Sequence, residues 1–163
     1  MLVDLAEAIT SDGISLSGAY FEAKGDAGLG VDCLIYFHGD SGNFYGSLLR
    51  QLGEMFSEAG LAFLAANRRG HDMVSTGVRG GPLKGYAFES VEESRLDAAA
   101  WLDFLKGRGH EKIAIGGHSG GAVRATYAQA TEHFENVAAV VSVSPGEYNH
   151  EQVVNVHGED FSG

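Results

Sequence analysis

The sequence has one cysteine, few basic side chains and no long apolar run. Because Cys33 is alone and lies in an apolar segment, no internal disulfide can form, and we expect a buried thiol in a reducing compartment. There are 11 Lys and Arg against 22 Asp and Glu, a formal charge of −11. Nucleic acids and anionic membrane surfaces both bind clustered bases, so this balance argues against either as a partner.

The sequence also lacks the features typical of membrane proteins, secreted proteins and metal-binding proteins. No apolar stretch approaches the ~18 residues of a membrane span. The first seven residues, MLVDLAE, carry acids where a signal peptide would carry bases. We therefore expect a cytoplasmic protein with no membrane partner. No H-E-x-x-H motif and no paired Cys/His spacing is present, so we expect no metal site.

The composition that is present fits one globular domain. The chain has 163 residues, of which 44% are apolar and 20% charged, enough for a real core. Residues 3–10 and 14–21 are predicted as two strands, the second alternating at period two. The turn signal Ser11-Asp12-Gly13 between them predicts an opening hairpin.

Strand and helix patterns alternate from about residue 31 to 143. The continuous apolar runs that predict buried strands are 33–37, 61–66, 112–116 and 137–143. Helical spacing covers 48–56, a capping box at 90–93 opens a second helix that stops near 107, and a third runs from 122 to about 135. This alternation predicts an α/β fold with a mostly parallel sheet and helices on both faces.

Three polar, glycine-rich loops follow the predicted parallel strands. They are 38–43, 67–75 and 118–121. Ligands and chemistry gather beyond the carboxyl ends of the strands in such sheets. We therefore look for the site in these loops.

The segment 117–121, GHSGG, fits the G-x-S-x-G pattern of a nucleophile elbow, with a strand before it and a helix after it. That turn holds the hydroxyl of Ser119 up and exposed, beside the positive end of the helix. A structural turn serine is the plainer alternative. A phosphate-binding loop would need a lysine after Gly121, and a dinucleotide fingerprint would need glycine at position 118 or 119.

The loop after the strand 33–37 is expected to supply a second backbone N–H beside this elbow. In G-x-S-x-G enzymes the oxyanion is held by the N–H of the residue after the serine, here Gly120, and by one from the loop after an earlier strand. Asp40, in the His38-Gly39-Asp40 segment, is the natural second donor through its backbone. An ordinary His-Gly turn is the alternative. A carboxylate here would be unfavourable unless it points away or is bound elsewhere.

Segments 35–39, 66–71 and 115–121 (IYFHG, ANRRGH and IGGHSGG) resemble those of α/β-hydrolase fold proteins of the serine esterase, lipase and peptidase kind. The resemblance implies Ser119 as nucleophile, with Asp40 and Gly120 as oxyanion donors. It covers only the N-terminal part of that fold, so residues 1–163 would be a single domain that lacks the C-terminal strands. Residues 144–163 would then begin the family's lid region.

The family's catalytic order is serine, then acid, then histidine. Segment 153–160 resembles a strand that ends in its acid, which makes Asp160 a candidate triad acid. Only residues 144–152 separate it from the preceding strand, fewer than the ~10–12 that a parallel crossover needs. No histidine follows Asp160. The histidines that could be tried as the base, and that we expect to be satisfied loop or core residues, are His38, His71, His110, His118, His133, His150 and His157.

The sequence thus predicts a serine hydrolase for a small-molecule ester, thioester or amide, working through an acyl-serine and needing no cofactor. Acyl transfer to an alcohol would use the same residues. Without a convincing acid and base, we expect the 163-residue chain alone to be inactive. A non-catalytic α/β-hydrolase-like binding protein is the alternative. We also expect the apolar strand 137–143 to form an unpaired edge that promotes self-association.

Overall fold

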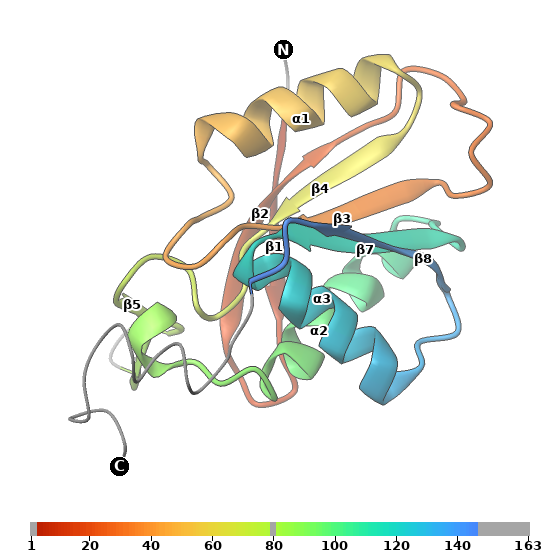
Figure 1. The fold of residues 1–163 in the computed structure, drawn as a ribbon. Coiled ribbons are helices and arrows are strands. Elements are labelled where there is room, and N and C mark those ends of the chain that lie inside the picture. Colours follow the sequence, from red (N-terminus) through yellow and green to blue (C-terminus); the bar gives the residue numbers. More distant parts are fainter. Residues whose placement is uncertain (1–2, 79–80, 147–163) are drawn as a thin grey trace.

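A computed structural model describes residues 3–78 and 81–146 and contains a twisted sheet of six strands (Figure 1). In spatial order the strands are β1 (Asp4–Ile9), β2 (Ser15–Phe21), β4 (Ala62–Ala66), β3 (Cys33–Phe37), β7 (Ile113–His118) and β8 (Val137–Val143). β1 and β2 form the predicted antiparallel hairpin, and β2 is also antiparallel to β4. The other neighbours pair in parallel, as the alternation of strand and helix predicts.

Helices cover both faces of the sheet. α1 (Ser47–Glu58) packs on one face, and α2 (Ser94–Gly107) and α3 (Gly120–Glu132) pack together on the other (Figure 1). The prediction of a mostly parallel sheet between two helical layers is therefore confirmed. The continuous apolar runs of β3 and β4 follow from this arrangement, because both faces of these strands are buried.

The two helical layers enclose two apolar clusters. On the α1 side, Leu49 packs with Phe63 of β4. On the other side, Trp101 of α2 is fully buried and donates from Nε1 to the carbonyl of Asn67 at 2.7 Å. A Cβ on Gly18 would lie 2.9 Å from the Trp101 ring, so glycine in β2 makes room for the indole.

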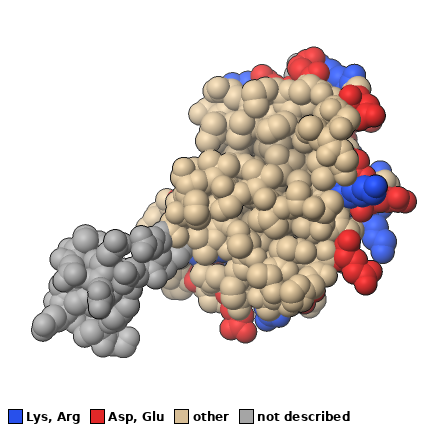
Figure 2. Space-filling view, turned by 45° about the vertical axis from the view of Figure 1, so that its right-hand side comes forward, with Lys and Arg blue, Asp and Glu red and all other residues tan. Residues whose placement is uncertain are grey.

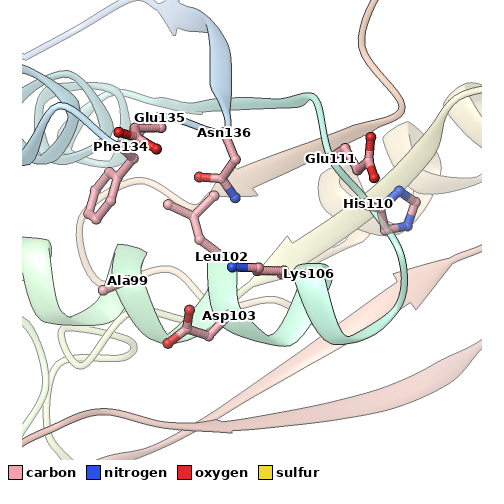
Figure 3. A pocket seen from close by; sticks show the side chains of 9 residues that line it. All are labelled: Ala99, Leu102, Asp103, Lys106, His110, Glu111, Phe134, Glu135 and Asn136. Carbon is pink, nitrogen blue, oxygen red and sulfur yellow. The ribbon is translucent and has the colours of Figure 1, made fainter.

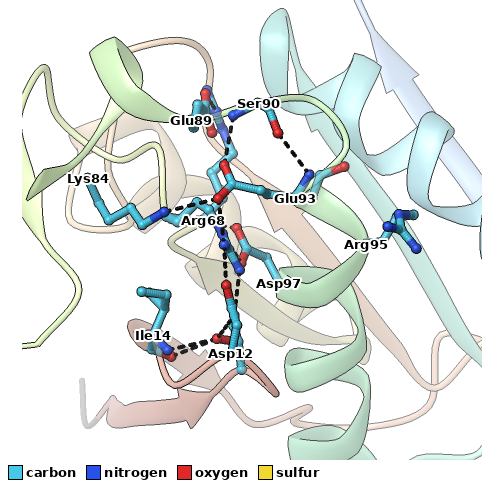
Figure 4. A network of polar contacts seen from close by, with 12 residues as sticks. Asp12, Ile14, Arg68, Lys84, Glu89, Ser90, Glu93, Arg95 and Asp97 are labelled. Carbon is cyan, nitrogen blue, oxygen red and sulfur yellow. Dashed lines mark hydrogen bonds and ion pairs between the residues drawn. The ribbon is translucent and has the colours of Figure 1, made fainter. Parts of the chain in front are cut away.

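The hairpin is held to α2 by a buried arginine. The guanidinium of Arg69 binds Asp97 of α2 at 2.9 Å, Asp12 of the β1–β2 turn at 2.7 Å and Glu93 at 3.0 Å. Figure 4 shows these three carboxylates converging from the turn and from the start of the helix. The cluster therefore joins three segments that lie far apart in the sequence.

The start of α2 and the end of α3 differ from the predicted helix boundaries. The predicted capping box forms, since Ser90 N donates to Glu93 and Glu93 N to Ser90, but α2 itself begins only at Ser94. α3 ends at Glu132, before the predicted 135, because His133 has the left-handed backbone conformation, φ 52°. The loop 67–88 also contains elements too short for a periodic signal: β5 (Ser75–Thr76), β6 (Leu83–Lys84) and the 3₁₀ turn η1 (Tyr86–Phe88).

β8 forms one edge of the described sheet. Its apolar side chains are partly or largely exposed, with Val140 at 41%. Figure 2 shows a broad face of the molecule with almost no charged side chains, although the chain as a whole is strongly acidic. Self-association through the β8 edge stays a prediction. Of the helices in residues 3–78 and 81–146, none has the length and apolar character needed to cross a membrane.

Candidate active site

Ser119 lies at the sharp junction between β7 and α3. Its backbone angles are φ 54° and ψ −124°, a conformation that non-glycine residues rarely adopt. Neighbouring glycines make the turn possible, because a Cβ on Gly117 would lie 2.6 Å from the backbone of Gly121 and 2.8 Å from the carbonyl of Phe37. Such strain persists only where the surrounding structure enforces it, and it concentrates at functional sites.

The loop after β3 runs directly beside this turn. β3 and β7 are paired neighbours up to Phe37 and Gly117, so their carboxyl ends meet. A Cβ on Gly39 would stand 3.4 Å from the Cβ of Ser119. The structure therefore brings Asp40, which follows Gly39, next to the turn formed by Ser119 and Gly120. The roles of Asp40 and Gly120 as oxyanion donors stay predictions.

The Asp40 carboxylate is bound by two arginines. Oδ1 accepts from Arg68 at 2.9 Å and from Arg124 at 3.2 Å, and Arg124 also donates to the carbonyl of Gly120 at 3.2 Å. A Cβ on Gly120 would collide with this carboxylate. The sequence left open how an acidic side chain could stand near an oxyanion, and the two guanidinium groups provide the compensating charge.

The same arginines share a second acid, Glu89. It pairs with Arg68, and it accepts from Arg124 at 2.7 Å. Arg68 is 1% exposed and the Glu89 side chain 2%, so water screens these pairs little. A Cβ on Gly70 would collide with the Glu89 carboxylate, which explains glycine there. We call Asp40, Arg68, Glu89 and Arg124 the elbow cluster.

The histidines near the elbow have separate environments. His38 is 4% exposed, and burial, helped by the charge of Arg68, lowers its pKa to about 3, which makes it a poor base. His118 is exposed. His71 binds Asp72 at 2.7 Å, and Asp72 accepts from Asn43 at 3.0 Å.

Within residues 3–78 and 81–146, no histidine is hydrogen-bonded to the Ser119 hydroxyl. At the far end of the sheet, His110 binds Tyr20 at 2.8 Å and Asp32 at 3.2 Å. Asp160, His150 and His157 lie outside the described residues, as does most of the proposed lid region. The roles predicted for these three residues stay predictions.

Two pockets lie at opposite ends of the sheet. One, of about 300 Å³, adjoins the elbow and is lined by the loop after β3, the start of α1 and His118. The other, of about 390 Å³, lies between α2 and the segment before β8, at the amino ends of β7 and β8. Figure 3 shows that Asp103, Lys106 and Glu135 line this second pocket, together with apolar side chains. The first pocket fits the predicted chemistry better, because its lining residues Gly39 and His118 adjoin Ser119, whereas the second pocket lies at the other end of the sheet.

Sequence reasoning missed most of the elbow cluster. Arg124 could have been noticed in the sequence, because it is a basic residue among small and apolar residues on the helix that follows the serine. Glu89 carried no such signal, since it follows a long irregular loop and meets Arg124 across 35 positions. No group of three or more His, Cys, Asp or Glu side chains able to hold a metal occurs in the part of the chain that the structure describes.

No protein-family model and no curated protein sequence matches the chain. Solved structures do match. The α/β hydrolase GrgF from Penicillium sp. sh18 shares 23% identity at a TM-score of 0.70, over 89% of this chain and 46% of that one. The esterase Pf2001 from Pyrococcus furiosus shares 20% identity at a TM-score of 0.71, over 97% and 54%. Est1E from Butyrivibrio proteoclasticus, solved with ferulic acid, shares 24% identity at a TM-score of 0.66, over 86% and 53%.

The chain thus spans about half the length of these solved proteins. From the sheet order, the two helical layers and these similarities, the chain has the α/β-hydrolase fold.

Proposed function

We propose that this chain carries the nucleophile and oxyanion hole of a serine hydrolase that cleaves a small-molecule ester, thioester or amide. The observation that carries the proposal is the strained backbone of Ser119 at a strand–helix junction. Gly39 and the elbow cluster lie against that junction. The similarity to solved hydrolases and esterases supports the same reading.

In the proposed reaction, Ser119 Oγ attacks the substrate carbonyl carbon and its proton passes to a histidine base. The carbonyl oxygen becomes an oxyanion held by the backbone N–H groups of Asp40 and Gly120. Gly120 is in the first turn of α3, where an N–H has no acceptor within the helix. The leaving group takes the proton, and water then hydrolyses the acyl-serine to a carboxylic acid.

The side chains of the elbow cluster support this chemistry, and only the backbone N–H of Asp40 takes part in it. Arg68 and Arg124 hold the Asp40 side chain, and so the loop that carries the Asp40 N–H, against the Gly120 backbone. Placement of such donors governs how much they stabilise the transition state. The triad acid and the base stay predictions, with Asp160 as the candidate acid.

A non-catalytic binding protein with the same fold is the second candidate. The observation that favours it is that Ser119 Oγ has no hydrogen bond to a histidine among residues 3–78 and 81–146. A serine without an activating base would leave a pocket that binds ligands but forms no acyl-enzyme.

A fluorophosphonate probe distinguishes the two, because it labels only an activated serine. The hydrolase proposal expects one label per chain, found on Ser119 by peptide mapping and lost in Ser119→Ala. The assay includes the 163-residue chain and the product of the reading frame continued past Gly163 in the source DNA. Labelling of the continued product alone would place the base beyond this chain. No labelling of either product would favour the binding protein.

A further inference from the structure

A further pocket, of about 410 Å³, lies on the α1 side of the sheet. It is bounded by the β1–β2 hairpin, the loop before α1 and the first half of that helix. Val3, Ala19, Phe21 and Phe44 give it an apolar wall. Its volume is within the ~300–1,000 Å³ range of small-molecule sites, so it can hold a single ring with a short chain.

α1 separates this pocket from the one beside Ser119. In the sheet, β4 lies between β2, which lines the hairpin pocket, and β3, which lines the pocket beside the serine. α1 covers β4, where Leu49 packs with Phe63. The described lining residues of the two pockets do not overlap. A ligand in the hairpin pocket would therefore lie across α1 from Ser119.

Among the described residues that line the hairpin pocket, Arg50 is the one cation. Its Nη1 donates to Glu54 Oε1 at 2.9 Å, and the two side chains are 58% and 40% exposed. An ion pair so exposed contributes little stability, and this bond uses only one of the five N–H donors of the guanidinium. The accessible guanidinium can therefore also bind a ligand anion at the edge of the pocket.

The neighbouring side chains define what kind of anion fits. The carboxylate of Glu54 repels a second anion beside Arg50, and it repels a dianion more than a monoanion. The planar fork of a guanidinium matches the two oxygens of a carboxylate. Phe21 and Phe44 in the apolar wall favour an aromatic ring, because aromatic pairs gain from offset or edge-to-face packing.

We propose that the hairpin pocket binds a small aromatic carboxylate, with its ring on the apolar wall and its carboxylate on Arg50. Tyr45 also lines the pocket and is 62% exposed. Its hydroxyl already donates to Asp72 at 3.2 Å, so its ring serves as apolar surface for the ligand. The site is additional to the one at Ser119 and does not depend on the proposed hydrolase function.

3-Phenylpropanoate and 3-phenylpropanamide test the carboxylate, because they have nearly the same shape and only the first is an anion. Isothermal titration calorimetry of the Ser119→Ala chain gives both dissociation constants and prevents any turnover of the amide at the serine. We expect 3-phenylpropanoate to bind about fivefold more tightly, the effect of one partly exposed ion pair.

Two substitutions on α1, each added to Ser119→Ala, should change that preference in opposite directions. Arg50→Gln removes the cation and should bring the two affinities within about twofold of each other. Glu54→Gln removes the competing carboxylate, so it should strengthen 3-phenylpropanoate about threefold and leave the amide unchanged. If Arg50→Gln does not fold, the gain in Glu54→Gln decides.

Two further substitutions locate the site on one side of α1. Tyr45→Ala removes apolar surface from the hairpin pocket, so it should weaken both ligands and keep their ratio. Leu48→Ala trims the pocket beside Ser119 and should change either affinity by less than about twofold. The proposal is overturned if neither compound binds, if the two bind equally, or if the preference survives in a folded Arg50→Gln. A loss in Leu48→Ala as large as that in Tyr45→Ala would also overturn it.

Discussion

Two consecutive arginines, Arg68 and Arg69, are both 1% exposed and bind carboxylates in different ways. Within the described residues, Arg69 binds three acids, which come from the hairpin turn and from the start of α2. Figure 4 shows the carboxylates of Asp12, Glu93 and Asp97 close together. Arg68 instead shares Asp40 and Glu89 with a second cation, Arg124.

The two groups differ in the ratio of acids to arginines, and this difference fits their different distances from Ser119. The Arg69 group joins elements away from the serine, where excess negative charge affects no reaction. Among the described residues, the elbow cluster pairs two cations with two acids beside the proposed oxyanion. An uncompensated carboxylate there would oppose the chemistry. We infer that the first mainly determines stability and the second mainly the position of the loop 38–43. Substitutions in the two groups should therefore affect stability and the reactivity of Ser119 to different extents.

The largest effect is expected from Asp97→Ala. The variant leaves the Arg69 guanidinium in the interior without its most deeply buried partner, and removing one member of such a pair costs about 3 kcal/mol or more. The free energy of unfolding, from chemical denaturation, measures it. Asp103→Ala, an exposed change on the same helix, is the control and should cost less than about 0.5 kcal/mol. Similar losses in the two variants would contradict a structural role for Arg69.

A variant in the elbow cluster should affect Ser119 more than it affects stability. Asp40→Asn keeps the side-chain size but weakens its bonds to Arg68 and Arg124, so the loop can shift from the Gly120 backbone. In whichever form of the protein is labelled by fluorophosphonate, we expect labelling of Ser119 to slow about tenfold, since small misplacements of catalytic groups have large effects on rate.

Glu89→Gln is the matched control for that rate. It removes a charge from the same cluster, but Glu89 lies on a segment that does not carry an oxyanion donor. Labelling should change less than about twofold while stability falls by about 1–3 kcal/mol. Equal slowing in both variants would mean that cluster charge, rather than loop position, affects the serine.

The division between the two arginines was only partly visible in the sequence. The resemblance of segment 66–71 to α/β-hydrolases assigned no separate role to Arg68 or to Arg69. The sheet, its two helical layers and the turn at Ser119 were predicted because apolar runs and G-x-S-x-G are local patterns. The partners of Arg68 could not be predicted in this way, because Asp40, Glu89 and Arg124 meet only after three separate segments pack together.

Acid should weaken the Arg69 group through Asp12. Hydrogen bonding from Arg69 lowers the pKa of Asp12 from 3.8 to about 2. The Asp12 carboxylate therefore takes up a proton less readily in the folded state than in the unfolded state. The stabilisation is therefore complete above about pH 4 and is lost as the pH falls towards 2. Because the side chain is 39% exposed and thus screened, we expect only about 1 kcal/mol.

Unfolding free energies of the parent chain and of Asp12→Asn, measured from pH 5 to pH 2, isolate that contribution from the other acids. The difference between the two proteins should be largest at pH 5 and shrink towards pH 2. A difference that stays constant across this range would mean that Asp12 contributes through packing and not through its charge.

The smallest effect concerns Glu93, the rim of the Arg69 group. Glu93 binds Arg69 and Lys84, both at 3.0 Å, and also accepts from the Ser90 backbone in the capping box. Glutamine can still close that box, so Glu93→Gln removes the ion pairs alone and should cost about 0.5 kcal/mol. Ser90→Ala removes the cap alone.

Salt separates these contributions, because screening acts on exposed charges and far less on buried ones. In 1 M salt the cost of Glu93→Gln should largely vanish, while those of Ser90→Ala and Asp97→Ala should persist. If the loss of unfolding free energy caused by Glu93→Gln does not change with salt, the Glu93 carboxylate is as little screened by solvent as that of Asp97. The Arg69 group would then contain two interior pairs, with Asp97 and with Glu93, and Asp12 would be its one partner at the surface among the described residues.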